Sequence, residues 1–252
     1  MESTLAIAIA AMAIGLVKGG IGGSLAGAIV LPLLTQQMSV AGAVGVAMPL
    51  LIMGDIFAMG VYWREWEVRY LRLLLPGAIV GIVIGTVLLV SLPDLVLRRI
   101  LGVTTIVAVI YKLASDSMPH LNYRPRDWHG QLAGMAAGLA STLANLGGPP
   151  ITAWLLLQRS QPAAFVGTIT FFFFFVNLAK LPGYFATGVV DLPLIASLVW
   201  ALPLVPPFVW LGRRVINRVD RLLFERVMLA LLALAGVSLL LSAPVNQAPG
   251  VS

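Results

Sequence analysis

The chain contains no cysteine and few charged residues. Of its 252 residues 10% are charged, whereas soluble domains usually carry about 25%. The absence of cysteine excludes disulfides, thiolate metal sites, iron–sulfur clusters and cysteine nucleophiles. With 60% hydrophobic residues and a mean hydropathy of +0.98, the composition also excludes a soluble globular domain. We therefore expect one integral membrane domain.

The motifs of common enzymes are also lacking. The two histidines, His120 and His129, flank one polar segment instead of sharing a helix face. They therefore cannot form a His-x-x-x-His zinc site or a pair of intramembrane haem ligands. No protease signature and no Walker A motif is present. We expect that the chain is not an enzyme, that it binds no cofactor or metal, and that it does not itself use ATP.

The basic residues outnumber the acidic ones, which gives a formal net charge of +6. Most of the basic residues lie in short loops between apolar runs, where Lys and Arg mark the cytoplasmic face of a membrane protein. Membrane topology explains this charge better than an acidic partner does. No nucleic acid is therefore expected as a partner.

Long apolar runs predict an all-α polytopic membrane protein with about 8 to 10 membrane segments. Two adjacent pairs of runs, near 4–17 with 24–36 and near 129–144 with 149–158, are short for a bilayer. Each pair is expected to be a broken helix or a re-entrant pair. The spanning helices are expected near residues 40–63, 69–91, 95–114, 162–185, 191–212 and 219–242.

The order of short and long runs repeats once along the chain. We expect repeat one at 1–114, a linker at 115–127, repeat two at 128–242 and a short polar tail at 243–252. A shift of about 122 to 127 residues aligns a sparse but ordered set of positions, as an old duplication would. The aligned positions are Gly22-Gly23 with Gly147-Gly148, Asp55 with Asn177, Tyr62 with Tyr184, Leu75-Pro76 with Leu202-Pro203, and Asp94 with Asp220.

Matching loops of the two halves carry opposite basic content, which predicts inverted repeats. The loop near 62–68 is flanked by arginines and its partner near 184–191 has none, and the next pair of loops reverses this. If each short pair enters and leaves on one side, only Arg98 and Arg99 face outward and both termini lie outside the cytoplasm. The residues then facing the cytoplasm are Arg64, Arg69, Arg72, Lys112, Arg124, Arg126, Arg159, Arg213, Arg214, Arg218, Arg221 and Arg226. A single broken crossing per pair would send Arg159 and the last five outward, which the charge rule disfavours.

Two helix breaks inside apolar sequence, at 18–24 and 142–150, form the candidate site. Glycine allows a tight turn, and Pro149 or Pro150 suits the first turn of a helix. Two helix N-termini at membrane depth supply N–H donors and positive dipole ends, so they predict a central anion site. The alternative is that the glycines permit close helix packing. The candidate substrate-binding residues are Lys18, Gly19, Gly20, Gly22, Gly23, Ser24, Thr142, Asn145, Gly147, Gly148 and Pro149.

Lys18, Asp55 and Lys180 are charged residues in otherwise apolar sequence. Lys18 is expected to supply positive charge to the anion, with snorkelling or an ion pair with Asp55 as alternatives. Asp55 is a candidate for proton coupling or for that ion pair, or it merely faces water. Lys180 lies five residues from Phe185, which favours snorkelling of its amine to the outer interface. Lys180 and Asn177 remain secondary candidates for the site.

At the two glycine turns the sequence resembles the TauE/SafE family, also called the TSUP family of sulfite and organosulfonate exporters. The first turn, Gly20-Ile21-Gly22-Gly23-Ser24 followed by Pro32-Leu33, is similar to that family's Gly-x-Gly-Gly-Gly and Pro-x-Leu pattern. Asn145-Leu146-Gly147-Gly148-Pro149-Pro150 looks like the matching second element. Ser24 and Asn145 stand where glycine is usual. Because these departures lie beside the expected substrate, they bear on substrate identity more than on fold.

The resemblance implies proton-linked or passive movement of sulfite, thiosulfate, sulfoacetate or related organosulfonates across a bacterial inner membrane. We therefore expect a secondary transporter that works by alternating access around a midplane site. Its expected partners are a small anionic substrate and the lipid bilayer, with protons as a candidate coupling ion and a homo-oligomer as a candidate assembly. The alternative is a non-transporting membrane anchor or assembly subunit of an enzyme complex.

Overall fold

The computed structural model describes residues 2–21, 26–97, 126–156, 158 and 162–216, with isolated positions between 99 and 110 and between 230 and 241. These parts are helical and contain no strand, so the predicted all-α class is confirmed for them. Of the expected linker at 115–127, residues 115–125 lie outside the described residues. So do half of the expected segment near 95–114 and most of the one near 219–242.

Each half begins with a long helix, a very short helix and another long helix. The first half contains α1 (Glu2–Ile21), α2 (Ala26–Leu34), α3 (Val40–Val61) and α4 (Val68–Ser91). The second contains α6 (Asp127–Ala144), α7 (Gly148–Leu156), α8 (Pro162–Ala186), α9 (Leu192–Leu198), the 3₁₀ turn η1 (Leu202–Leu204) and α10 (Val205–Ile216).

The two helices of each initial pair differ in length, which corrects the expectation that both are short. The first helices, α1 and α6, have 20 and 18 residues, whereas α2 and α7 have nine each. Hydropathy marks the apolar stretch only, whereas a helix continues for as long as its backbone hydrogen bonds do. The backbone of α1 thus runs on past Lys18 through Gly19 and Gly20.

The run expected as one segment at 191–212 is broken into α9, η1 and α10, with a bend of 50°. Asp191 caps the start of α9, because its Oδ1 accepts a hydrogen bond of 2.7 Å from the backbone N–H of Leu194. Pro203, Pro206 and Pro207 follow within a few residues, and each removes a backbone donor. A continuous α-helix is therefore disfavoured here.

Three helices are long and apolar enough to cross a membrane by length and composition, among the residues that the structure describes. They are α3, α4 and the part of α8 from Gly167 to Ala186. The bent pair of α9 with η1 and α10 is a fourth if it counts as one span. The chain is thus a helical multi-pass membrane protein.

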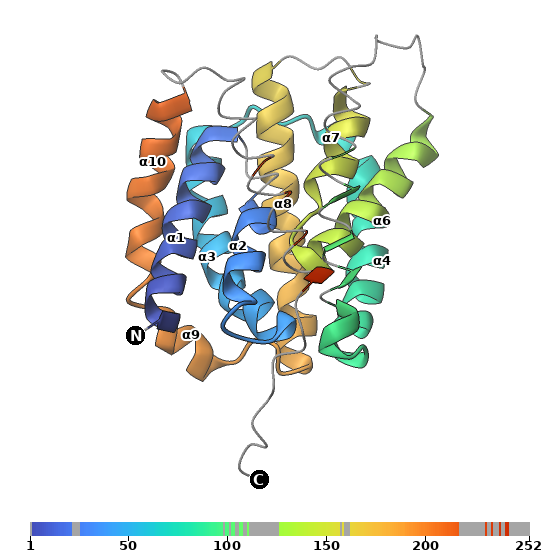
Figure 1. Ribbon diagram of the computed structural model, residues 1–252. Helices are drawn as coiled ribbons and strands as arrows, with labels where there is room; N and C mark the ends of the chain where they lie inside the picture. The colour runs from blue at the N-terminus through green and yellow to red at the C-terminus, as the bar shows by residue number, and fades with distance from the viewer. Residues whose placement is uncertain are drawn as a thin grey trace.

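Two close helix pairs flank the centre of the molecule (Figure 1). The blue α1 packs along the orange α10 on one side, the green α4 packs along α6 on the other, and α8 lies between them with α3 against it. Both outer pairs approach through glycines. Added Cβ atoms at Gly77 and Gly81 of α4 would clash with the carbonyls of Gln131 and Met135 in α6.

The same close approach occurs where α1 meets α10. An added Cβ at Gly19 would clash with the carbonyl of Val209, and one at Gly212 would clash with the carbonyl of Leu16. Small residues four apart allow helix backbones to approach in membranes, where dispersion and weak hydrogen bonds replace the hydrophobic effect. Glycine packing therefore joins the first helix of each half to the other half.

The apolar interior is divided into two clusters. One is built mainly from α1, α2, α3 and the α9–α10 region, and the other from α4, α6, α7 and α8. Along α8, Val176 belongs to the second cluster and Tyr184 to the first. Asn177 and Lys180 lie between these two positions, so buried polar groups occur where the two clusters meet.

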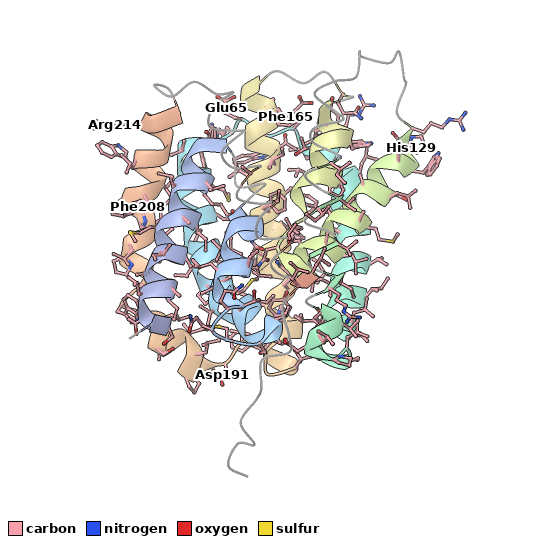
Figure 2. All side chains as sticks on the ribbon, viewed as in Figure 1. Glu65, His129, Phe165, Asp191, Phe208 and Arg214 are labelled. Atoms are coloured by element: carbon pink, nitrogen blue, oxygen red, sulfur yellow. The ribbon has the colours of Figure 1, made fainter. Side chains whose placement is uncertain are left out.

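The two ends of the molecule differ in the segments they gather. Figure 2 places Glu65 of the α3–α4 loop, His129 at the start of α6 and Arg214 at the end of α10 at one end. Asp191 lies at the opposite end, as do the start of α1 and the helix α9 (Figures 1 and 2). The α3–α4 loop and the α8–α9 loop thus lie at opposite ends.

Candidate functional site

Lys18 and Asp55 form a buried ion pair. Lys18 lies in the last turn of α1 and Asp55 in the C-terminal half of α3, and both side chains are almost completely inaccessible. The Lys18 ammonium donates to Asp55 Oδ1. Asn177 of α8 donates from Nδ2 to the second carboxylate oxygen at 2.6 Å. The charge of Lys18 is therefore matched by a carboxylate in this conformation.

Lys180 lies at the centre of the protein and not at the interface, so the expectation that it snorkels is wrong. Its side chain is fully buried, and its Nζ donates to the Ser141 carbonyl at 3.1 Å and to Ser141 Oγ at 3.2 Å. A third bond of 3.0 Å reaches Asn145 Oδ1. The physical reason is that the end of α6 presents three acceptors, so the amine is satisfied without reaching water.

Lys180 forms no ion pair with a carboxylate among the described residues. The ion pair of Lys18 with Asp55 is the only one found there, and Lys180 contacts only neutral oxygens. Two buried lysines thus share one buried aspartate. With all three groups ionised, the interior carries one net positive charge.

The second helix break lies where the sequence predicts it. Asn145 ends α6 in the left-handed conformation with φ of 49°, which asparagine tolerates better than most residues. The N–H of Leu146 returns to the carbonyl of Ala140 at 3.1 Å, which closes the helix end. Pro149 and Pro150 stand in the first turn of α7, as expected from their missing N–H groups.

The Asn145 side chain is buried and only half satisfied. Its exposed fraction is 7%, and its Oδ1 accepts the bond from Lys180. Its Nδ2 has no hydrogen-bond partner among the described residues. Leaving a buried amide donor unpaired costs about 1–3 kcal/mol, so such a group calls for an explanation.

One face of α8 carries the groups that join the cluster. Phe173, Asn177, Lys180 and Tyr184 are buried and follow one another at intervals of three and four residues, which places them on one side of the helix. The Phe173 ring lies 5.8 Å from Lys18 Nζ, and Tyr184 donates its hydroxyl to the Thr142 carbonyl at 2.9 Å. Sequence reasoning missed these roles of Phe173 and Tyr184, although this spacing signals them.

The remaining candidates of the first break are only partly described. Gly19 packs against Val209 of α10, as the packing alternative describes, and Gly20 lies in the last turn of α1. Gly22, Gly23 and Ser24 lie outside the described residues. The structure therefore places Lys18 of this break in the polar cluster and leaves its glycine turn undescribed.

The remaining candidates of the second break have mixed surroundings. Thr142 donates its hydroxyl to the Gly138 carbonyl of its own helix at 2.8 Å. Gly147 is tightly packed, because an added Cβ would lie 2.6 Å from the Ala137 carbonyl. Gly148 and Pro149 begin α7. Ser141, which the sequence analysis did not select, contacts Lys180 directly.

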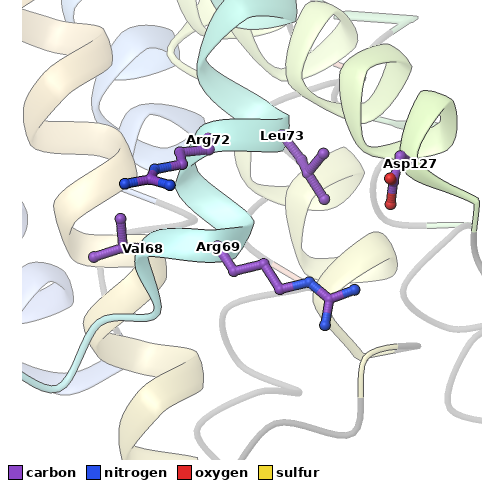
Figure 3. A pocket seen from close by; sticks show the side chains of 5 residues that line it. All are labelled: Val68, Arg69, Arg72, Leu73 and Asp127. Atoms are coloured by element: carbon purple, nitrogen blue, oxygen red, sulfur yellow. The ribbon is translucent and has the colours of Figure 1, made fainter.

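A separate cavity of about 410 Å³ opens at the ends of α4 and α6 (Figure 3). It is lined by Val68, Arg69, Arg72, Leu73 and Asp127, so it does not include the central polar residues. Within the described residues, no group of three or more acidic or histidine side chains could hold a metal ion.

Comparison with known proteins identifies a family for nearly the whole chain. The sequence model of the family described as "Sulfite exporter TauE/SafE" matches residues 7–239. Searches of curated proteins and of solved structures found no significant match. Members of this family are transporters, which agrees with the expectation that the chain is not an enzyme. The chain belongs to the TauE/SafE family of sulfite exporters.

Proposed function

We propose that this protein is a secondary transporter that moves a small sulfur-containing anion, such as sulfite, thiosulfate, sulfoacetate or a related organosulfonate. The main support is that the buried cluster contains two lysines, Lys18 and Lys180, and only one aspartate, Asp55, so it carries one net positive charge when all three groups are ionised. A buried cationic excess favours an anion over a cation as cargo, because the anion offsets the cost of the buried charge.

We propose further that the two halves are inverted repeats. Asp55 and Asn177, aligned by the proposed duplication, are 122 residues apart and bond to each other. Residues that are equivalent by a two-fold axis and that touch each other must lie at that axis. The glycine-packed pairs, α1 with α10 and α4 with α6, are likewise equivalent under the exchange of halves. Rocking of one repeat against the other around a central site would then give alternating access.

The orientation follows from the charge rule. The end that carries Glu65, His129 and Arg214 in Figure 2 also gathers the basic loop near Arg64 and the start of α6 at Arg126. Loops rich in Lys and Arg face the cytoplasm, so this end is cytoplasmic in a bacterial inner membrane. The start of α1 lies at the other end, and the proposal places both termini outside the cytoplasm.

Within this proposal the polar cluster and the two helix breaks form the anion pathway. Lys18 and the break backbones supply charge and N–H donors. Asp55 is the candidate proton carrier, because protonation of its carboxylate would release Lys18 from the ion pair. Repeat one at 1–114 and repeat two at 128–242 would each contribute one break to a single transport domain.

The test is flux through reconstituted vesicles together with anion-dependent thermal stabilisation of the purified protein. The panel is sulfite, thiosulfate, sulfate, sulfoacetate, isethionate, taurine and chloride at matched ionic strength and several pH values. A ligand of the native state raises apparent stability by mass action. We expect selective stabilisation and flux with a sulfur anion. If no anion of the panel stabilises the protein and none is transported, the proposed function is wrong.

Proton coupling is tested separately with Asp55→Asn, which keeps the shape of the side chain. We expect loss of the dependence of flux on an imposed pH gradient. Flux that still responds to the gradient as the wild type does would exclude Asp55 as the proton carrier. The matched control is Asp191→Asn, since Asp191 caps α9 at the end of the molecule far from the cluster.

A further inference from the structure

Lys180 has its hydrogen bonds satisfied but not its charge. Its ammonium has three N–H groups, and these meet the Ser141 carbonyl, Ser141 Oγ and Asn145 Oδ1. All three acceptors are neutral, whereas Lys18 donates to the Asp55 carboxylate. A buried ammonium without a counter-charge is costly, so an anion next to Lys180 would be stabilised.

Two hydrogen-bond donors lie beside this ammonium. Asn145 turns Oδ1 toward Lys180, which leaves the Nδ2 of the same carboxamide without a partner among the described residues. The Ser141 hydroxyl accepts from Lys180 and retains its own proton for donation. An oxoanion close to Lys180 can accept hydrogen bonds from Asn145 Nδ2 and from the Ser141 hydroxyl. Such bonds are strong because the acceptor is charged.

The helix that follows adds a third contribution of the same sign. The nine-residue α7 begins at Gly148, three residues after Asn145. Its N-terminal end carries a partial positive charge. Ammonium, amide donor and helix end therefore come together at the break between α6 and α7.

We propose that Lys180 and Asn145 bind the transported anion at this break, with Lys180 as its counter-charge. The ligand class is a small oxoanion of sulfur with one or two negative charges. This inference rests on the proposed function and deepens it. It assigns the positive charge that faces the anion to Lys180, because Lys18 is already in an ion pair with Asp55. The competing explanation is that Lys180 merely caps the last turn of α6 through the Ser141 carbonyl.

The Asn145→Asp substitution separates these explanations. It adds a carboxylate of nearly the same shape at the atom that lies 3.0 Å from Lys180 Nζ, and aspartate also tolerates the left-handed backbone. If Lys180 only caps α6, it keeps its hydrogen bonds in this variant and the anion affinity does not change. If Lys180 binds the anion, the new carboxylate neutralises its charge, so the anion binds more weakly while the fold is kept.

The experiment measures sulfite affinity and sulfite-dependent thermal stabilisation of the full-length protein in detergent micelles. Lys180→Gln is the second variant, because glutamine can still donate to the same acceptors without the charge. The control is Arg214→Gln, which removes one positive charge from an exposed arginine stacked on Trp210 at 3.5 Å.

We expect Asn145→Asp and Lys180→Gln to weaken sulfite binding about tenfold or more, as loss of a charged partner does. Arg214→Gln should bind as the wild type does, and Asn145→Asp should have a melting temperature without ligand that is no lower than that of the wild type. If the wild type binds sulfite and either Asn145→Asp or Lys180→Gln binds it equally well, the assignment of Lys180 and Asn145 is wrong, but the proposed function stands. Absence of sulfite binding and flux in the wild type would overturn the proposed function itself.

Discussion

The two buried lysines of this protein both place an amine in the interior, away from water, but they are stabilised by different partners. Lys18 donates to a carboxylate that Asn177 also holds, so a charge pair is buried as a unit. Lys180 donates to three neutral oxygens at the end of α6 and forms no ion pair among the described residues. The difference teaches that one lysine is held by a carboxylate, whereas the other is held by neutral acceptors alone.

The two halves of the chain share an architecture but not this charge distribution. The shift of 122 residues that aligns Asp55 with Asn177 places Lys180 opposite Ala58. The carboxylate therefore comes from the first half, and the lysine that forms no ion pair comes from the second. A site between repeats need not be symmetric, because each copy of a duplicated position is free to change alone.

Breaking the Lys18 pair should have the largest effect on stability. Lys18→Met leaves Asp55 buried without a cation, and removal of one partner of a buried pair costs about 3–5 kcal/mol. Unfolding of the protein in mixed micelles measures the free energy. The double variant Lys18→Met with Asp55→Asn should recover much of the loss. A double variant as unstable as the single one would show that the pair is not what stabilises Lys18.

The second largest loss of stability is expected when the hydrogen bond of Asn177 to Asp55 Oδ2 is removed. Asn177→Leu removes the 2.6 Å bond to Asp55, and bonds to charged groups contribute about 1.5–3 kcal/mol. The loss should shrink when Asp55 is already Asn, which a double-mutant cycle of unfolding free energies measures. Equal losses in both backgrounds would mean that Asn177 acts through packing alone.

A smaller loss is expected at the other lysine. Lys180→Met removes a charge that has no buried counter-charge, so only neutral acceptors are left unpaired, at about 1–3 kcal/mol. The comparison with Lys18→Met uses the same unfolding assay and the same substituted side chain. A cost equal to or above that of Lys18→Met would contradict the difference drawn between the two lysines.

The smallest effect is expected at Tyr184, which borders the Lys180 side of the cluster. Tyr184→Phe removes the hydroxyl that donates to the Thr142 carbonyl at 2.9 Å, and such bonds in membrane proteins average about 0.6 kcal/mol. The matched control is Tyr62→Phe at the aligned position. A change at Tyr62 as large as that at Tyr184 would show that the assay does not resolve this bond.

Much of the fold was predictable because it depends on local chemistry. Hydropathy identified the helical membrane class, and Asn145 with Pro149 and Pro150 marked the second helix break correctly. The lengths of α1 and α6 and the break between α9 and α10 were not predicted. Backbone hydrogen bonding continues past an apolar run, and the bend at 199–204 depends on several prolines acting together with a capped helix start.

The candidate site was predictable in its residue types but not in its pairings. An ion pair of Lys18 with Asp55 was one of several alternatives open from the sequence, and the structure shows that pair. Snorkelling of Lys180 was expected from its distance to the end of the segment. The outcome depended instead on which acceptors α6 presents to it, and these lie 35 and 39 residues away in the chain.

The sequence by itself determined that this chain forms apolar membrane helices, where the helix break of the second half lies, and which family the chain belongs to. These properties follow from hydropathy, from the backbone limits of glycine and proline, and from short motifs. Only the tertiary structure decided that Asp55 pairs with Lys18, whereas Lys180 contacts neutral oxygens. Electrostatic pairing in a buried interior depends on distances of a few ångströms between helices, and no single segment contains that information.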